Sequence, residues 1–209
     1  MADARRDGGR RLLPLGGYVE PWRFLTSVFL HSPTSATHLL FNLMGLYVMG
    51  QFLEPFLGRA RFVALYLLSA LGGSVGSLML VPALDLSAQA SVFAWTQSMV
   101  GASGAVFGLF AAAFLVLRRT GAPVAGMVVL LAINLALPFV YPNIAWQAHL
   151  GGAVVGLVAA GLMFFTARPG RTKAQWPALI VLAAGLVVTA WIKYEVNGRA
   201  LGVLIEHLQ

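Results

Sequence analysis

The sequence predicts an all-α protein, a bundle of helices that crosses a membrane several times. Of its 209 residues, 59% are hydrophobic and only 10% are charged, whereas soluble domains carry about 25% charged residues. The chain also contains several apolar runs of the roughly 20 residues that a membrane-spanning helix needs. We predict six spans, over residues 38–57, 62–82, 99–117, 122–142, 144–166 and 176–192.

The region before the first predicted span has a different character. Residues 12–35 include prolines and charged residues that exclude an apolar helix of spanning length. These residues are Pro14, Glu20, Pro21, Arg23 and Pro33. We therefore expect a folded loop or a segment that lies at the membrane interface.

Basic residues in the loops set the expected orientation, because cytoplasmic loops carry an excess of Lys and Arg. The loops after the first, third and fifth spans contain Arg59, Arg61, Arg118, Arg119, Arg168, Arg171 and Lys173. The loops around residues 83–98 and 141–143 contain no Lys or Arg. The first, third and fifth spans are therefore expected to run from the outside to the inside.

The N-terminal residues conflict with this topology. Residues 1–37 would lie outside, although four arginines occur within residues 1–11, and no apolar stretch typical of a signal peptide follows them. A further span before residue 12 would remove the conflict. We therefore expect the N-terminus of this chain to be truncated or mis-started.

The charge and the cysteine content narrow the function classes. The net charge of +7 is attributed to loop arginines that face anionic lipid. No basic patch is interleaved with aromatic residues, so a nucleic-acid partner is not expected. The absence of cysteine from the sequence excludes disulfides and thiol chemistry.

Four polar side chains fall at similar depth within three of the predicted spans. Ser103 lies four residues into the third span and His149 five residues into the fifth, about 6 and 8 Å deep at the rise of an α-helix. His38 and Asn42 begin the first span and share one helical face. Because polar groups within a membrane are costly and tend to be functional, we predict that the four side chains form one site.

Ser103 and His149 are the residue types of a nucleophile and its general base. A neutral imidazole can take the proton of a serine near neutral pH. The oxyanion formed next needs hydrogen-bond donors, which the Ser103 backbone N–H, the Asn42 amide and the His38 imidazole could supply. No Asp or Glu lies at this depth, so we expect a Ser–His dyad and not a triad.

The glycines near these residues also have a purely structural interpretation. Gly101-Ala102-Ser103-Gly104 is a weak signal alone, because a serine in a Gly-rich helix is often a packing residue and Gly104-x-x-x-Gly108 is a close-packing motif. Gly72-x-x-x-Gly76 and Gly152-x-x-x-Gly156 are assigned to helix contacts. The second of these pairs would let the His149 helix approach the Ser103 helix closely.

Other intramembrane chemistries lack their residues in this sequence. A zinc protease needs His-Glu-x-x-His, which does not occur. An aspartyl protease needs two aspartates in the membrane, whereas Asp3, Asp7 and Asp85 lie outside the predicted spans. His38 and His149 have no third metal ligand at their depth. We therefore expect no metal site and no cofactor.

The ordered set of motifs resembles the rhomboid intramembrane serine proteases. The matching residues are Glu20-x-Trp22-Arg23, His31, His38-x-x-x-Asn42, Glu54, Gly101-x-Ser103-Gly104, and Ala148-His149 followed by Gly152-x-x-x-Gly156. The resemblance covers about residues 20 to 166. It implies that Ser103 is the nucleophile and His149 the general base, and that His38, Asn42 and the Ser103 backbone stabilise the oxyanion.

The resemblance also implies a division of the chain. Residues 1–37 would be an N-terminal polar segment and partial outer loop, residues 38–166 the catalytic helix bundle, and residues 167–209 a cytoplasmic loop, an extra C-terminal helix and a tail. The family core has six helices, so the first core helix is missing from this chain. The span 176–192 cannot obviously replace it, because it runs in the opposite direction through the membrane.

A second departure from the family pattern is Phe107, where well-known bacterial members have a tyrosine against the catalytic imidazole. The Phe107 ring could still stack on His149, but any contact through a hydroxyl is lost.

The expected function is that of an intramembrane serine endopeptidase in the bacterial inner (plasma) membrane. It would cleave transmembrane helices of membrane proteins near the outer face, through an acyl-enzyme intermediate, with its substrates and the lipid bilayer as partners. One alternative is a rhomboid-like protein that binds transmembrane helices without cleavage, favoured by the missing helix and opposed by the presence of Ser103 and His149. A small transporter or channel would favour inverted repeats and mid-membrane charges, and neither is evident. The oligomeric state stays open.

Overall fold

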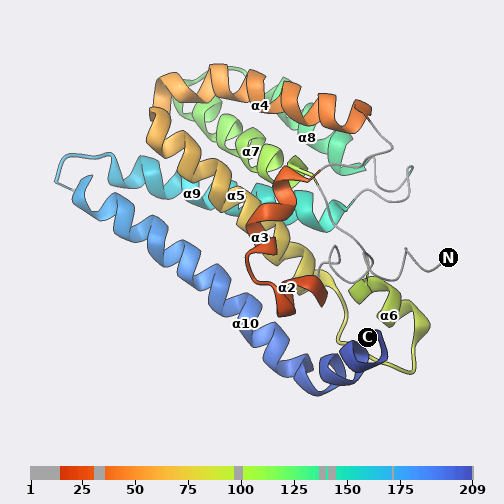
Figure 1. Ribbon diagram of the computed structural model, residues 1–209. Helices are drawn as coiled ribbons and strands as arrows, with labels where there is room; N and C mark the ends of the chain where they lie inside the picture. Colours follow the sequence, from red (N-terminus) through yellow and green to blue (C-terminus); the bar gives the residue numbers. More distant parts are fainter. Residues whose placement is uncertain are drawn as a thin grey trace.

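The computed structural model describes residues 15–30, 36–96, 101–136, 140, 145–170 and 172–208. Within these ranges all regular structure is helical, as the sequence predicts (Figure 1). Helices near the predicted spans are α4 (Ala36–Leu57), α5 (Arg59–Leu80), α7 (Ser103–Thr120), α8 (Ala125–Ala136), α9 (Trp146–Thr166) and α10 (Gln175–Leu208). Shorter elements are α2 (Leu15–Val19), α3 (Arg23–Thr26), η1 (Ser27–Phe29), α6 (Gln89–Thr96) and η3 (Thr172–Ala174).

Length and hydropathy are sufficient for membrane insertion in most of this bundle. Among the described residues, four segments are long and apolar enough to cross a membrane: α5, α7, α9 and Thr172–Glu206, which contains most of α10. α4 has the necessary length of 22 residues, but His38, Asn42 and Gln51 lower its hydropathy. α4, which carries two of the predicted site residues, is therefore not among the four segments.

The third predicted span begins four residues too early. The sequence predicts a helix from residue 99, but Gly101 and Ala102 are not helical and α7 begins at Ser103. Gly101 has a φ of +118°, which is incompatible with a right-handed helix. Counting the depth of Ser103 along a helix from residue 99 is therefore wrong, although Ser103 does lie at the beginning of its helix.

Three further elements differ from the prediction. α8 has 12 residues, none of them buried, and the predicted residues 137–139 and 141–144 lie outside the described part of the chain. α10 has 34 residues and continues to Leu208, because Leu201 and Leu204 extend its buried stripe beyond residue 192. α6 was not predicted from the sequence, because its eight residues are too few for a membrane span.

Glycines allow α7 and α9 to pack with their backbones in contact. A Cβ atom placed on Gly152 would lie 1.9 Å from the Gly104 carbonyl oxygen, and one on Gly156 would lie 2.3 Å from the Gly108 Cα. Real side chains do not fit at such distances, so only glycine permits this approach. The two Gly-x-x-x-Gly motifs thus form the helix contact that the sequence predicts for them.

The pairs of close contacts also give the relative directions of the helices. Residue numbers rise together in the α7–α9 pairs, so these two helices are parallel. Gly72 lies against Val155 and Gly76 against Gly151, so α5 runs antiparallel to α9. Gly45 of α4 lies against Val106 of α7. Together with the contact between His38 and Gly101 described below, this makes α4 parallel to α7. These relations agree with the alternation that the loop charges predict.

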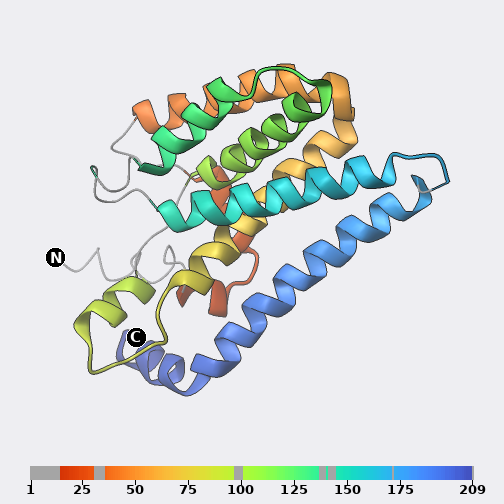
Figure 2. The same ribbon diagram turned by 180° about the vertical axis from the view of Figure 1, so that it is seen from behind.

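The main hydrophobic core lies around α7. Its fully buried side chains come from α4, α5, α7 and α9, including Leu53, Leu65, Leu109 and Ala159, and Leu179 at the start of α10 completes it. Figure 2 shows α10 crossing the bundle diagonally on the side of α5 and α9, with its C-terminal end beside α6. A second buried cluster fills the space between the C-terminal half of α10, α3, α5 and α6.

The loop between α5 and α6 is held by its own polar side chains. The Ser87 hydroxyl and the Ser87 N–H donate to the Asp85 carboxylate at 2.6 and 2.9 Å, and these hydrogen bonds hold the pKa of that carboxyl below its usual value. The Asp85 N–H donates to the Ser91 hydroxyl of α6 at 3.0 Å. The short helix α6 is thereby fixed to the end of α5.

Candidate active site

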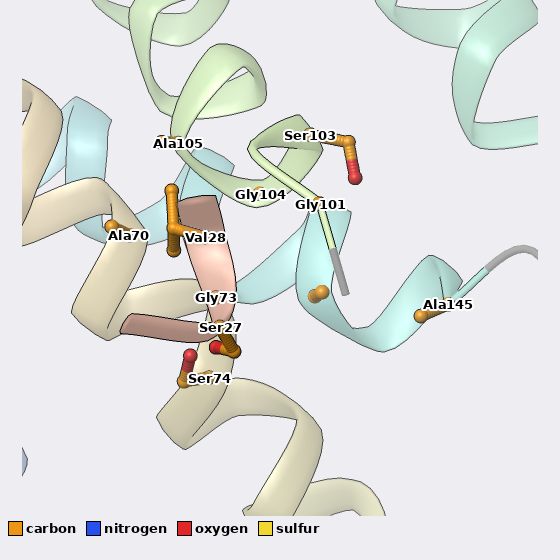
Figure 3. Close-up of a pocket in the computed structure, with 11 residues that line it drawn as sticks. Ser27, Val28, Ala70, Gly73, Ser74, Gly101, Ser103, Gly104, Ala105 and Ala145 are labelled. Atoms are coloured by element: carbon orange, nitrogen blue, oxygen red, sulfur yellow. The ribbon is translucent and has the colours of Figure 1, made fainter. Parts of the chain in front are cut away.

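Ser103 is the first residue of α7 and stands at the mouth of a small pocket. The first hydrogen bond of the helix runs from the Val106 N–H to the Ala102 carbonyl at 2.9 Å. The N–H groups of Ser103, Gly104 and Ala105 therefore have no partner within the helix, because they precede its first turn. Figure 3 shows the Ser103 side chain at this helix end, with Gly101 leading into it.

Gly101 connects the nucleophile segment to two other parts of the fold. Its N–H donates to the Ser27 carbonyl of η1 at 3.2 Å. A Cβ atom placed on Gly101 would lie 2.7 Å from the Cε1 atom of His38, so the imidazole of α4 packs directly on this glycine. Neither Ser27 nor the backbone of Gly101 was assigned a role from the sequence. The signal for Gly101 was its position, a glycine two residues before a candidate serine.

His149 lies in the first turn of α9, and its orientation is determined by an aromatic ring. The imidazole is 7% exposed and stacks on Phe107, with ring centroids 4.1 Å apart and an interplanar angle of 8°. Within the described part of the chain its buried Nδ1 atom has no hydrogen-bond partner. The stacked Phe107 ring is thus the contact that the structure gives this imidazole, and no carboxylate among the described residues bonds to it.

His38 and Asn42 flank the same segment from α4. The Asn42 side chain is buried, and its Nδ2 donates to the His38 carbonyl at 2.8 Å. Asn42 and Ala102 both line an apolar pocket of about 440 Å³ between η1, α4, α5 and α7. The His38 ring thus packs on Gly101, and the Asn42 side chain lines the same pocket as Ala102.

The pocket beside Ser103 is narrow. It is lined by Ser27, Val28, Ala70, Gly73, Ser74, Gly101, Ser103, Gly104, Ala105, Ala145 and Ala148 (Figure 3). Its volume is about 30 Å³, above the roughly 10–15 Å³ that a cavity needs to hold one water molecule and far below the roughly 300–1,000 Å³ of small-molecule sites. In this form the pocket has room for water and not for a peptide segment.

The structure thus gathers the predicted site residues at the beginnings of three parallel helices. His38 is the third residue of α4, Ser103 the first of α7, and His149 the fourth of α9. Ser103 and His149 are both described, and no hydrogen bond joins their side chains here; such contacts are often long before substrate binds.

Of the other residues that carry the resemblance, Glu20 and Arg23 are described and His31 is not. Arg23 pairs with Glu20 at the start of α3. In the ranges that the structure covers, no cluster of three His, Cys, Asp or Glu side chains could hold a metal ion.

Comparisons with known proteins identify the family of the chain. A family model described as the Rhomboid domain matches residues 18–166. The chain is 37% identical over 148 residues to YdcA of Bacillus subtilis (strain 168), covering 68% of this chain and 67% of that protein. It is 32% identical over 172 residues to the rhomboid protease GluP of the same organism, covering 78% of this chain but 30% of GluP.

A plant relative shows the same similarity. RHOMBOID-like protein 4 of Arabidopsis thaliana is 30% identical over 194 residues, which cover 81% of this chain and 45% of the relative. The chain thus spans less than half of GluP and of the plant protein. The match of the family model over most of the chain, together with the apolar helical bundle, shows that this integral membrane protein belongs to the rhomboid family.

Proposed function

We propose that this protein is an intramembrane serine endopeptidase in which Ser103 is the nucleophile and His149 the general base. One observation carries the proposal: the glycine contacts of α7 and α9 place the beginnings of these parallel helices side by side. Ser103 begins one helix, and His149, stacked on Phe107 of the first helix, lies in the opening turn of the other.

The reaction follows from these positions. His149 takes the proton of the Ser103 hydroxyl as the serine oxygen attacks the scissile carbonyl carbon. The protonated His149 then gives its proton to the leaving amine as the carbon–nitrogen bond breaks, which leaves an acyl-enzyme ester on Ser103. Water, activated by the same imidazole, hydrolyses that ester and regenerates the serine.

Three groups are proposed to stabilise the oxyanion. The Ser103 N–H at the start of α7 has no partner within its helix and lies at the positive end of the helix dipole. His38 packs on Gly101, and Asn42 borders Ala102. Donors that converge on a developing negative charge each contribute about 3–4 kcal/mol to the reaction barrier in other enzymes.

The proposed substrates are transmembrane helices of other membrane proteins, cut near the outer face of a bacterial inner membrane. The basic loops predict that the beginnings of α4, α7 and α9 face the outside. A helix must unwind locally before its carbonyl groups can reach Ser103, because its backbone is hydrogen-bonded throughout a span. α8 has no buried residue, so it is the helix whose displacement costs least apolar contact.

Labelling with a serine-directed fluorophosphonate tests the proposal. The wild-type protein in detergent is expected to become labelled and to cleave a single-pass membrane substrate. Ser103→Ala should give no label, because the attacking oxygen is gone. His149→Ala should slow labelling by about 10²- to 10⁴-fold, the usual contribution of a general base.

The controls separate catalysis from binding. Thr120→Ala removes an exposed hydroxyl at the opposite end of α7, where it is hydrogen-bonded to carbonyl groups of its own helix, and should label at the wild-type rate. If the folded wild-type protein neither labels nor cleaves, but still co-purifies with transmembrane substrates, the endopeptidase proposal is wrong and a helix-binding role without cleavage takes its place.

Phe107 offers a second prediction. Phe107→Leu keeps an apolar side chain at this buried position but removes the ring that stacks on His149. We expect labelling to slow by about tenfold or more, because aromatic pairs contribute about 0.5–1.5 kcal/mol beyond area burial and small displacements of a catalytic group are costly.

The matched control for Phe107 is Phe110→Leu in the same helix. Phe110 packs on Phe107 in a T-shaped pair, with ring centroids 5.8 Å apart, whereas the ring stacked on the imidazole is that of Phe107. It should lose stability without the same loss of labelling rate. Equal rates for the two variants would contradict a role for the stacked ring.

A further inference from the structure

The C-terminal half of α10 carries an aromatic residue that contacts three other elements. Tyr194 is 6% exposed, and its ring centroid lies 5.4 Å from that of Tyr18 in α2, 6.1 Å from Phe24 in α3 and 6.4 Å from Trp95 in α6. Tyr194 is thus the centre of a group of rings from four helices, which we call the aromatic hub; Tyr194, Phe24 and Trp95 are buried and Tyr18 is exposed at its edge.

Polar side chains of α10 fix the hub against the end of α5. The Lys193 ammonium donates to the Val81 carbonyl at 2.7 Å, where it satisfies one of the carbonyl groups beyond the last turn of α5. One turn further along, the Asn197 side-chain oxygen accepts a hydrogen bond from the Leu84 N–H at 2.7 Å. The position of Tyr194 is therefore set by contacts on both sides of it in the sequence.

Two chain segments lead from the hub to the start of α7. Phe24 is followed three residues later by Ser27, whose carbonyl accepts the hydrogen bond from the Gly101 N–H. The Phe24 carbonyl itself accepts a hydrogen bond from the Ser74 hydroxyl of α5 at 2.8 Å. On the other side, Trp95 is six residues before Gly101 and is fully buried, with its indole N–H donating to the Pro82 carbonyl at 2.9 Å.

The Ser27 partner of the Gly101–Ser27 hydrogen bond is thus connected to Tyr194 through the described residues Phe24–Ser27, whereas residues 97–100 between Trp95 and Gly101 lie outside the described part of the chain. Gly101 determines where α7 begins and lies under the His38 ring. We infer that Tyr194 is a positioning residue: its ring holds the Phe24 and Trp95 segments together so that Gly101, and with it the Ser103 hydroxyl, is placed correctly. The extra C-terminal helix is therefore part of the apparatus that sets the site geometry.

This inference deepens the proposed function and rests on it for its kinetic consequence. It predicts that truncating the ring changes the rate at the site, and not merely the stability of the fold. Tyr194→Ala should slow fluorophosphonate labelling of Ser103 by about tenfold or more, since a displacement of about 1 Å can cost about 10²-fold in rate. Tyr194→Phe keeps the ring contacts and should restore most of the rate.

Two variants of the same helix are the matched controls. Trp191→Ala removes a larger ring from α10, but Trp191 is 60% exposed on the outer face of the helix, and this variant should label like the wild type. Leu179→Ala removes a buried side chain at the other end of α10, within the main core. It should lower the melting temperature as Tyr194→Ala does, yet leave the labelling rate of the folded fraction unchanged.

Amide hydrogen exchange tests the inference without relying on catalysis. The Gly101 N–H should exchange at least about tenfold faster in Tyr194→Ala than in Leu179→Ala, because only the first variant loosens the hydrogen bond to Ser27. If the Gly101 N–H of the wild type exchanges slowly but Ser103 is not labelled by the fluorophosphonate, the endopeptidase proposal fails. The comparison of exchange rates between the two variants still tests whether Tyr194 positions Gly101. Equal exchange and equal labelling rates in Tyr194→Ala and Leu179→Ala would overturn the inference.

Discussion

Gly152→Ala is expected to abolish most of the fluorophosphonate labelling of Ser103, although it adds only one methyl group. The new Cβ atom would lie 1.9 Å from the Gly104 carbonyl oxygen and 3.0 Å from the Gly104 Cα. These are backbone atoms of α7, which cannot rotate away as the end of a side chain can. The two helices must separate, and the change should cost about 1–3 kcal/mol or more in folding stability.

The separation affects the site directly because Gly104 follows Ser103 and Gly152 is one turn after His149. A displacement of about 1 Å between catalytic groups costs about 10²-fold in rate, so we expect a loss of that order. The measurements are the labelling rate constant and the melting temperature in the same detergent.

Gly161→Ala is the matched control on the same helix. A Cβ atom on Gly161 meets no atom within 4 Å, and both substitutions gain the same helix propensity, about 1 kcal/mol. Gly161→Ala should therefore label normally and melt no lower than the wild type. A Gly152→Ala protein that matches it in both measurements would show that α7 and α9 do not pack as described.

Gly101→Ala is expected to have the second largest effect. A φ of +118° lies far from the left-handed well near +60° that other residues can adopt, and strained backbone of this kind costs about 1–3 kcal/mol. The added methyl group would also meet the His38 imidazole at 2.7 Å. The variant must therefore move either His38, which we propose as an oxyanion donor, or the turn that leads into Ser103, and labelling should slow by about 10²-fold.

Gly121→Ala is a control that introduces backbone strain at a positive φ but no contact between the added methyl group and another side chain. Gly121 ends α7 in the left-handed conformation, with φ +72°, and a Cβ atom there has no neighbour within 4 Å. This variant should lose about 1–2 kcal/mol of stability and keep its labelling rate. If Gly101→Ala likewise loses stability but keeps its labelling rate, the contact between His38 and Gly101 does not matter for the reaction.

The sequence was sufficient to predict the polar side chains within the spans and the directions of their helices, because the membrane constrains both. Polar side chains are rare in apolar spans, so Ser103, His149, His38 and Asn42 stood out against their neighbours. Loop charges then predicted that their helices run parallel, and the close contacts of α4, α7 and α9 agree. The catalytic roles of these residues stay predictions until the variants are measured.

The features that the sequence did not predict depend on contacts between distant residues. The turn at Gly101 follows from a hydrogen bond to Ser27 and from the packing of His38, and neither leaves a mark in the hydropathy of residues 99–102. α6 is too short to resemble a span, and it is fixed by the Asp85–Ser91 loop. In the sequence nothing separates Tyr194 from Trp176 and Trp191, the other aromatic residues of α10, and its place becomes evident only from the three rings around it.

The paired glycines of α7 and α9 also have a consequence for axial register. Gly104 faces Gly152 and Gly108 faces Gly156 at the same time, and sliding one helix along the other by a turn, about 5.4 Å, would leave one glycine pair instead of two. The alignment of Ser103 with His149 along the helix axes is thus set by the backbone contacts of the two glycine pairs. Because no ionisable group takes part in that contact, the alignment should persist unchanged while the imidazole gains and loses its proton during turnover.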